Sequence, residues 1–512
     1  FSNTLGTFLS RILGLFKNIF INFYFGLIDT FWGAFQIINT FRIFVGEGAI
    51  NNILIPLYKK CYEENKLYVK YFVVKSFLFT SILSLFFTTI LALTSHYLAR
   101  IVFPGFDEKK ISETATFITV MSSVVLIISL QSFLAALQIA KYKNFIGFAF
   151  APVIANILTI ATIILFNFKG VASLSWAVVT GSIGMLVFQI MFFVRRSENE
   201  NLEIRLSELF KIDEYTKKFV LGFFSVIILS LIIQLNGIVS RFFGSFFDGV
   251  VAAMTNAYIL VQVPIGMFSV AVSTVGLNSL SELYSKNNIS GFRKLSNESV
   301  RMLNAFIIPI TVILVLLNDD IVRAVYRDIS GIILGSEGKY SVSALKLTQE
   351  LFSIYALSTY FISLNSVLTK ISFSRGKVSI PLINSIITLT TNILSNIIIF
   401  FTLRSYLGIP ISFFVSNLIS TLHIFIIENK NIHKKKEILT EVTKISIISV
   451  GCTVFVKSAF TILSAYDSYI ASFLLVSTKI LLSFAMILGI SYLLKVQTII
   501  TLLKKAFTYF LR

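Results

Sequence analysis

The sequence is poor in charge, cysteine and proline, and each scarcity excludes a class of protein. Only 13% of the 512 residues are charged while 56% are hydrophobic, so a water-soluble domain could not bury the apolar surface. The two cysteines, Cys61 and Cys452, lie far apart and indicate neither a disulfide scaffold nor a metal site. With seven prolines there is little room for extended linkers. These features predict an all-α protein that crosses a membrane many times.

Motifs of soluble enzymes are also missing. The chain has no phosphate-binding glycine loop, no metal-ligand spacing and no nucleophile triad, so we expect a transporter that needs no catalytic residues and no resident metal. The net charge of +19 does not indicate nucleic acid, because the basic residues concentrate in alternate loops. We therefore expect a membrane partner and no nucleic-acid partner.

Apolar runs long enough to span a bilayer recur along the whole chain. By the criterion of about 20 residues per span, the sequence predicts about 14 of them. They lie near 4–25, 30–58, 71–103, 114–140, 145–168, 171–194, 218–246, 249–281, 300–317, 343–369, 378–403, 406–427, 442–464 and 470–494. Roughly 28 of the 44 Lys and Arg residues fall in loops on one side, which predicts that both termini are cytoplasmic.

A polar stretch near the middle divides these spans into two lobes. We expect an amino-terminal lobe of six helices over 1–196, an amphipathic cytoplasmic linker over 197–217 and a second six-helix lobe over 218–428. Two further helices and a cytoplasmic tail follow over 429–512. Residues 137–157 and 369–393 weakly resemble each other, which indicates a duplicated unit, although the few identities leave a chance match open.

Polar and small residues recur at helical spacing on three predicted spans. Because polar groups facing lipid would lack partners, we expect each stripe to face a water-filled cavity. The stripes are Arg11, Gly14, Asn18 and Asn22; Asp29, Gly33, Gln36 and Thr40, with Asn39, Arg42 and Gly46 beside them; and Gln234, Gly237, Arg241, Gly244 and Asp248.

Three cations of these spans, Arg11, Lys17 and Arg42, lie within the first fifty residues. Each charge at a helix centre costs about 2.5–3.5 kcal/mol on insertion scales, so a chain that carries three is expected to use them on an anionic cargo. Two alternatives stay open for Lys17, which could snorkel to the surface or pair with Asp29. Arg241 could likewise line the cavity or pair with Asp248.

Other lysines inside predicted spans are not expected to bind cargo. They lie near helix ends or in the last two helices, where a long side chain reaches the membrane surface. We expect snorkelling for Lys346, Lys457 and Lys479.

The amino-terminal motifs resemble those of a known family. SRILGLFKN (10–18), DTFWGAF (29–35) and GEGAINNILIPLY (46–58), with Asn39 and Arg42 between them, resemble the signature of the MurJ (MviN) lipid II flippases of bacterial cell-wall synthesis. Weaker similarities follow in family order over nearly the whole chain. They are FPGFD (103–107), AFAPVIANI (149–157), GVASLSWAV (170–178), VPIGMFSVAV (263–272) and the helix over 375–396.

The resemblance implies a fold and a set of site residues. The fold is that of the multidrug/oligosaccharidyl-lipid/polysaccharide exporters, with two six-helix lobes around a cavity and two carboxy-terminal helices that line a groove for a lipid tail. The family's cavity cations correspond to Arg11, Lys17 (usually Arg) and Arg42, and its helix-two carboxylate to Asp29. Together with Asn18, Asn39 and Arg241, these residues form the predicted cargo-binding set.

Several positions depart from the family pattern. An acidic residue usually follows the second cation, where this chain has Asn18, and an essential Arg usually precedes Pro264 by five residues, where it has Ile259. We therefore predict that Arg241, one helix earlier, replaces that charge. Acidic positions on helices seven and eleven read Ser240, Asn392 and Asn396, which puts sodium coupling in doubt.

The resemblance also implies a cargo. This is lipid II, an undecaprenyl diphosphate that bears a muropeptide, moved across the bacterial cytoplasmic membrane by alternating access. We expect no cofactor, and an ion or the membrane potential remains open as the energy source. Proteins of cell-wall synthesis are candidate partners. The alternatives are a polysaccharide or O-antigen lipid flippase and a multidrug antiporter of the same superfamily.

Overall fold

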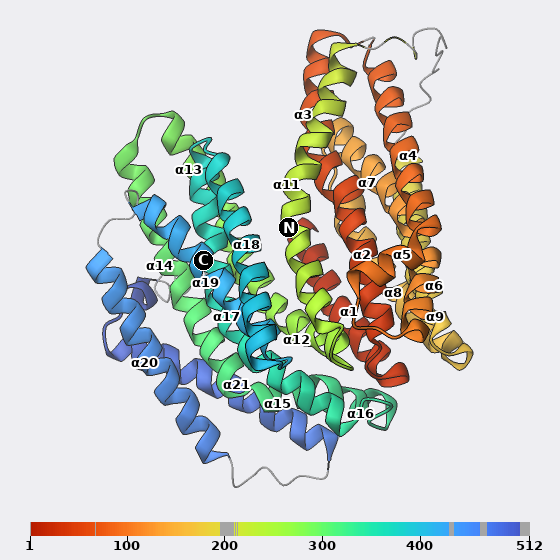
Figure 1. The fold of residues 1–512 in the computed structure, drawn as a ribbon. Coiled ribbons are helices and arrows are strands. Elements are labelled where there is room, and N and C mark those ends of the chain that lie inside the picture. The colour runs from red at the N-terminus through yellow and green to blue at the C-terminus, as the bar shows by residue number, and fades with distance from the viewer. Residues whose placement is uncertain are drawn as a thin grey trace. The chain divides into compact units, whose positions relative to one another are not determined.

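Helices joined by short connections build the computed structural model of the chain (Figure 1). The structure describes residues 2–66, 68–194, 209, 211, 213–429, 435–460 and 468–501. Within these residues every regular element is a helix, which confirms the predicted all-α class. The chain forms two compact units, Phe1–Ala252 and Ala253–Arg512.

The first unit contains the predicted spans one to seven. Its helix two is interrupted by a π-helical segment, η1, that lies between α2 and α3. The elements are α1 (Ser2–Phe25), α2 (Asp29–Arg42), η1 (Ile43–Glu47), α3 (Gly48–Glu64), α4 (Val69–Leu93), α5 (Ser95–Val102), α6 (Glu108–Met121), α7 (Ser123–Tyr142), α8 (Ile146–Phe166), η2 (Asn167–Lys169), α9 (Ala172–Val194) and α11 (Glu214–Gly244).

Helix α12 (Val250–Pro264) begins in the last residues of the first unit and continues into the second. The second unit holds the remaining spans and three short elements between α14 and α17. The elements are η3 (Ile265–Ser269), α13 (Val270–Ser285), α14 (Ile289–Leu316), α15 (Asn318–Arg323), η4 (Ala324–Asp328), α16 (Ile329–Leu334), α17 (Val342–Ser374), α18 (Ser379–Leu403), α19 (Gly408–Glu428), α20 (Lys435–Ala459) and α21 (Tyr469–Leu493).

Among the described residues, 11 helices are long and apolar enough to cross a membrane, and each overlaps a predicted span. The three other predicted spans also form helices, namely α1, the continuous run from α2 to α3, and α11. These three carry the predicted polar stripes. The multispanning fold is confirmed, and the count of about 14 spans stays a prediction.

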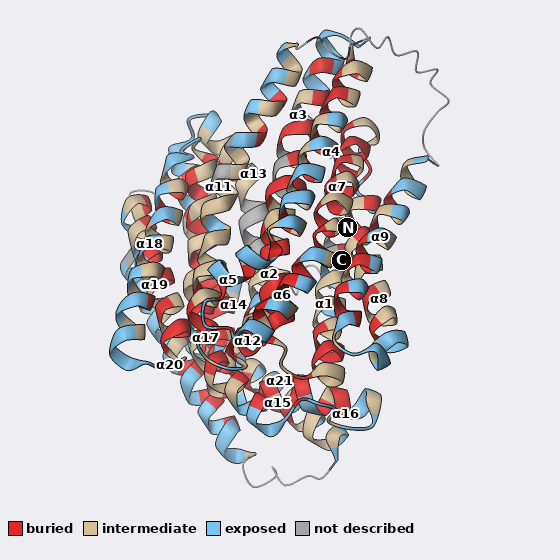
Figure 2. Cartoon of the chain, turned by 45° about the vertical axis from the view of Figure 1, so that its right-hand side comes forward, coloured by how far each residue is buried: buried red, intermediate tan, exposed pale blue. Residues whose placement is uncertain are grey.

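Many spans expose apolar side chains. Only 11% of the membrane-length window of α18 is buried, and the exposed residues on this helix are visible in Figure 2. They include Leu394, Ile398 and Phe401, each more than half exposed. Exposed aliphatic and aromatic side chains on a span of this length suit contact with lipid.

Helix α11 packs with the first unit, on α3, α2 and α4. The compact units therefore divide at Ala252, beyond the linker predicted over 197–217. Most of that predicted linker, and the end of the predicted cytoplasmic tail from residue 502, lie outside the described residues. The predicted division into lobes stays a prediction.

Small residues let the helices of the first unit approach closely. A β-carbon on Gly6 of α1 would lie 2.5 Å from the carbonyl oxygen of Ala149 on α8. One on Gly181 of α9 would lie 2.2 Å from Thr159 Oγ1 of α8. Close packing through small residues replaces the hydrophobic effect as the source of helix association in a membrane.

The prediction for Lys479 was wrong. This lysine of α21 is only 3% exposed, and its Nζ lies 2.8 Å from Asp320 Oδ2 of α15. The carboxylate of Asp320 neutralises the charge, so the side chain of Lys479 does not reach the surface. Lys346 and Lys457 are exposed, and Lys457 Nζ donates to the carbonyl oxygen of Leu316 at the end of α14.

A pair of buried glutamines joins α7 to α9 over a glycine of α8. Gln189 Nε2 donates to Gln138 Oε1 at 2.7 Å, and both side chains are fully buried. A β-carbon on Gly147 would lie 2.5 Å from Gln138 Oε1 and 2.8 Å from Gln189 Oε1. The glycine therefore makes room for the polar pair.

We expect Gly147→Ala to lower the free energy of unfolding by about 1–3 kcal/mol, because the added methyl group overpacks a buried site. Gly489→Ala on α21 is the matched control, since nothing lies within 4 Å of its added β-carbon. Thermal unfolding of the purified proteins in detergent measures both. Equal midpoints for the two variants would contradict this account of the glutamine pair.

Candidate functional site

The stripe on α1 does not face open space along its whole length. Gly14 lies beside α8, where its β-carbon would be 3.9 Å from Asn156 Nδ2. Asn18 and Asn22 are 0% and 1% exposed. The expectation of a water-facing stripe is therefore wrong for Asn18 and Asn22, because polar groups also serve helix packing, while Gly14 is partly exposed. Arg11, one turn before Gly14, is partly exposed.

Lys17 lies over an aromatic ring of α2. Its Nζ is 5.5 Å from the centroid of Phe35, within cation–π range. Arg42, at the other end of α2, is close enough for its positive charge to act on Lys17. Two positive charges within reach of each other repel, and an anion bound between them would relieve that repulsion.

The backbone changes directly after Arg42. Helix α2 ends at this residue and the π-helical η1 begins at Ile43. Short π-helical segments inside α-helices occur frequently at functional sites. Asn39, one turn before Arg42, is partly buried on the same helix.

Arg241 lies on the face of α11 that meets α2. Its Nη1 donates to the carbonyl oxygen of Gly237 at 3.1 Å. A β-carbon on Gly237 would be 3.5 Å from this Nη1 and 3.1 Å from Gln36 Nε2 of α2. The guanidinium and the Gln36 amide thus converge over Gly237, which brings Arg241 to the same helix that carries Phe35 and Arg42.

Asp29 is engaged by the start of α12. Its two carboxylate oxygens accept hydrogen bonds from the backbone N–H of Gly249 at 2.6 Å and of Ala252 at 2.8 Å. A carboxylate at a helix amino terminus satisfies free N–H groups and complements the helix dipole. The predicted role of Asp29 in cargo binding stays a prediction, and its oxygens serve the fold in this structure.

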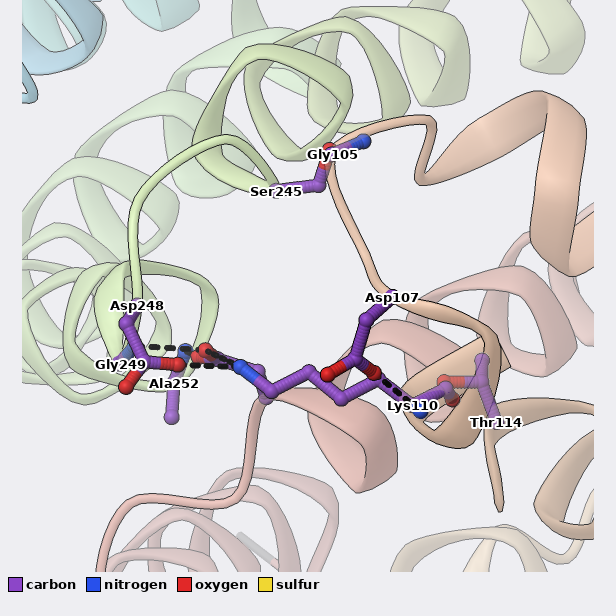
Figure 3. Close-up of polar contacts among 9 residues, drawn as sticks. Gly105, Asp107, Lys110, Thr114, Ser245, Asp248, Gly249 and Ala252 are labelled. Atoms are coloured by element: carbon purple, nitrogen blue, oxygen red, sulfur yellow. Dashed lines mark hydrogen bonds and ion pairs between the residues drawn. The ribbon is translucent and has the colours of Figure 1, made fainter. Parts of the chain in front are cut away.

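Lys110 completes this cluster, and Figure 3 shows its side chain reaching toward Asp248. Its Nζ lies 3.8 Å from Asp29 Oδ2 and forms an ion pair with Asp248. The structure thus gives Asp29 and Asp248 partners other than the ones weighed from the sequence, Lys17 and Arg241. Nothing in the sequence singled out Lys110, because a lysine in a predicted loop carries only topological information.

The departures from the family pattern lie in buried surroundings. Ser240 is 3% exposed, and its hydroxyl donates to the carbonyl oxygen of Asn236. Asn396 Nδ2 donates to Asn392 Oδ1 at 2.7 Å, and both side chains are buried. Ile259, in the second unit, is partly buried on α12. The prediction that Arg241 replaces a charge at Ile259 is untested by this geometry.

A family model described as lipid II flippase MurJ matches residues 22–475. The chain belongs to this family. It is 26% identical over 509 residues to a probable lipid II flippase MurJ of Rickettsia prowazekii (strain Madrid E), covering 96% of both chains. It is 28% identical to one of Aquifex aeolicus (strain VF5), covering 74% of this chain and 72% of that one. The predicted family is confirmed.

Solved structures agree with the fold. A lipid II flippase MurJ in an inward closed conformation matches with a TM-score of 0.78 at 22% identity, covering 96% of this chain and 98% of that one. An inward-facing multidrug resistance MATE family transporter of the MOP superfamily matches with a TM-score of 0.65 at 13% identity, covering 82% and 94%. At such identities the similarity shows the shared architecture alone.

We expect Asp29→Ala to lower the free energy of unfolding by about 0.5–2 kcal/mol, the usual range for losing a helix cap. Glu282→Ala on α13 is the control, since it also removes a carboxylate from an ion pair, with Lys286, but its side chain is 64% exposed and should contribute little. Thermal unfolding in detergent compares the two. A loss in the Glu282 variant as large as in the Asp29 variant would show that the cap is not the source of stability.

Proposed function

We propose that this protein moves lipid II from the inner to the outer leaflet of the bacterial cytoplasmic membrane, and that Arg11, Lys17, Arg42 and Arg241 bind its diphosphate. The observation that carries the proposal is the gathering of Lys17, Arg42 and Arg241 around α2 in a chain of the lipid II flippase family. The names of the relatives support the same cargo.

The chemistry of the cargo fits these residues. A diphosphate carries negative oxygens that accept two parallel hydrogen bonds from one guanidinium, so Arg42 and Arg241 suit it better than lysines would. Attraction between opposite charges strengthens where water is excluded. The apolar tail of the cargo needs no polar partner and can remain among the exposed apolar side chains and the lipid.

Movement would occur by alternating access, in which the bound cargo is exposed first to one side of the membrane and then to the other. Lipid II crosses the membrane without a covalent change, so the proposal includes no catalytic residue and no cofactor. The excess of Lys and Arg in one set of loops supports cytoplasmic termini. Enzymes that make or use lipid II are the class of partner proteins that this role would require.

We expect Arg11→Ala or Arg42→Ala to abolish precursor export while the protein still inserts into the membrane, because the lost contacts are to cargo. Lys17→Arg should support export and Lys17→Glu should not, since only the first keeps the positive charge. The assay is growth of cells depleted of their own flippase, with the lipid-linked precursors measured alongside.

The exposed Lys346→Ala is the control for loss of a lysine outside the site. Immunoblots of membranes check that all variants accumulate equally. Normal growth with both Arg11→Ala and Arg42→Ala at normal protein levels would show that the site is assigned wrongly.

A further inference from the structure

We propose that Lys75 and Lys110 are positioning residues that hold the two ends of α11 against the other helices of the first unit. Arg241 on α11 is then held beside α2, and the unit Phe1–Ala252 alone carries the cations Arg11, Lys17, Arg42 and Arg241. The inference rests on the proposed function for what these cations bind. The attachment of α11 itself depends only on contacts within the first unit.

Lys75 holds the beginning of α11. This lysine of α4 is 6% exposed, and its Nζ donates to Tyr68 Oη at 2.6 Å, to Asp213 Oδ2 at 3.0 Å and to the carbonyl oxygen of Lys211 at 2.6 Å. Asp213 caps α11 by accepting from the backbone N–H of Thr216 at 2.8 Å. One buried ammonium group therefore binds both the cap of α11 and the backbone before it.

The Asp213 carboxylate is well suited to this contact. Burial acts to raise its pKa, but hydrogen bonds from Tyr68, Thr216 and Lys75 lower the pKa to about 2. The carboxyl group of Asp213 is therefore ionised throughout the physiological pH range.

Lys110 holds the other end of α11. It comes from α6 and pairs with Asp248, four residues after the end of the helix, and with Asp29 of α2 (Figure 3). Beside it, the backbone N–H of Gly105 donates to Ser245 Oγ at 3.0 Å. The two lysines thus make the same kind of contact at opposite ends, each between an acidic residue next to α11 and a group of the first unit.

Between these ends, α11 packs directly on α3 and α4. A β-carbon on Gly222 would lie 3.3 Å from Ile53 Cγ2 of α3. Phe219 and Phe223 make edge contacts with Phe72 and Phe79 of α4 at centroid distances of 6.2 and 5.7 Å. With both ends held and the middle packed, α11 should move together with the first unit.

A disulfide between α3 and α11 tests this directly. The pair Ile53→Cys and Gly222→Cys suits a disulfide, because the added β-carbon already lies 3.3 and 3.6 Å from the two γ-carbons of Ile53. The background carries Cys61→Ser and Cys452→Ser, which removes both native thiols. Each single cysteine variant is a control for the substitutions themselves.

We expect the oxidised pair to export precursor as well as the reduced pair, since α11 never leaves α3. Loss of export on oxidation, with recovery on reduction, would overturn the proposal.

Lys110→Met should lower export roughly tenfold to a hundredfold, the range for a displaced binding group. Lys110→Arg should keep it, and Lys109→Met, at an exposed neighbour, should have no effect. Thermal unfolding of the Lys110→Met protein in detergent should give a midpoint close to that of the unmodified chain, which separates a displaced Arg241 from a general loss of stability.

Spin labels give a readout that needs no export. With labels at Ile82→Cys of α4 and Ile233→Cys of α11, both more than half exposed, we expect one distance that stays the same with and without lipid II. A second distance between the two labels in the presence of lipid II would overturn the proposed attachment of α11. This holds even if the cysteine pair or the Lys110→Met variant failed to accumulate. If the unmodified chain exported no precursor, the proposed function would fail, but the label distances would still test whether α11 stays attached to the first unit.

Discussion

A charge inside a bilayer has to be neutralised by a partner or used to bind something charged, and this constraint organises the molecule. Carboxylates neutralise several cations, as Asp320 does for Lys479 and Glu428 for Arg375. These pairs join helices of one unit and so contribute to its assembly. Around α2, the carboxylate of Asp29 accepts hydrogen bonds from the start of α12 and pairs with Lys110, and Lys17 lies over the ring of Phe35.

Much of the fold could be predicted because one physical signal determines it. A span needs about 20 apolar residues, and the loop charges alternate with the spans, so hydropathy located the helices well. Hydropathy says little about where a helix is interrupted or where one compact unit ends. The π-helical turn after Arg42 and the division of the units at Ala252 depend on contacts between distant segments, such as α11 with α3, which no local pattern contains.

The candidate site could be predicted in part. Helical spacing identified Arg42, Gln36 and Arg241 as polar groups on particular faces, and the structure brings these faces together around α2. Helical spacing does not reveal what lies opposite a polar stripe, so Asn18 was expected beside water but is fully buried. Lys110 and Lys479 were missed or misread for the same reason, because their partners come from segments far along the chain.

Binding of lipid II to the purified full-length protein tests the central claim most directly. Native mass spectrometry would compare the unmodified chain with a variant in which Lys17, Arg42 and Arg241 are all replaced by Gln. Because charge attraction between these groups and the diphosphate should dominate recognition, we predict that the variant loses most of its bound lipid II while keeping ordinary phospholipids. Equal retention of lipid II by both proteins would contradict the account.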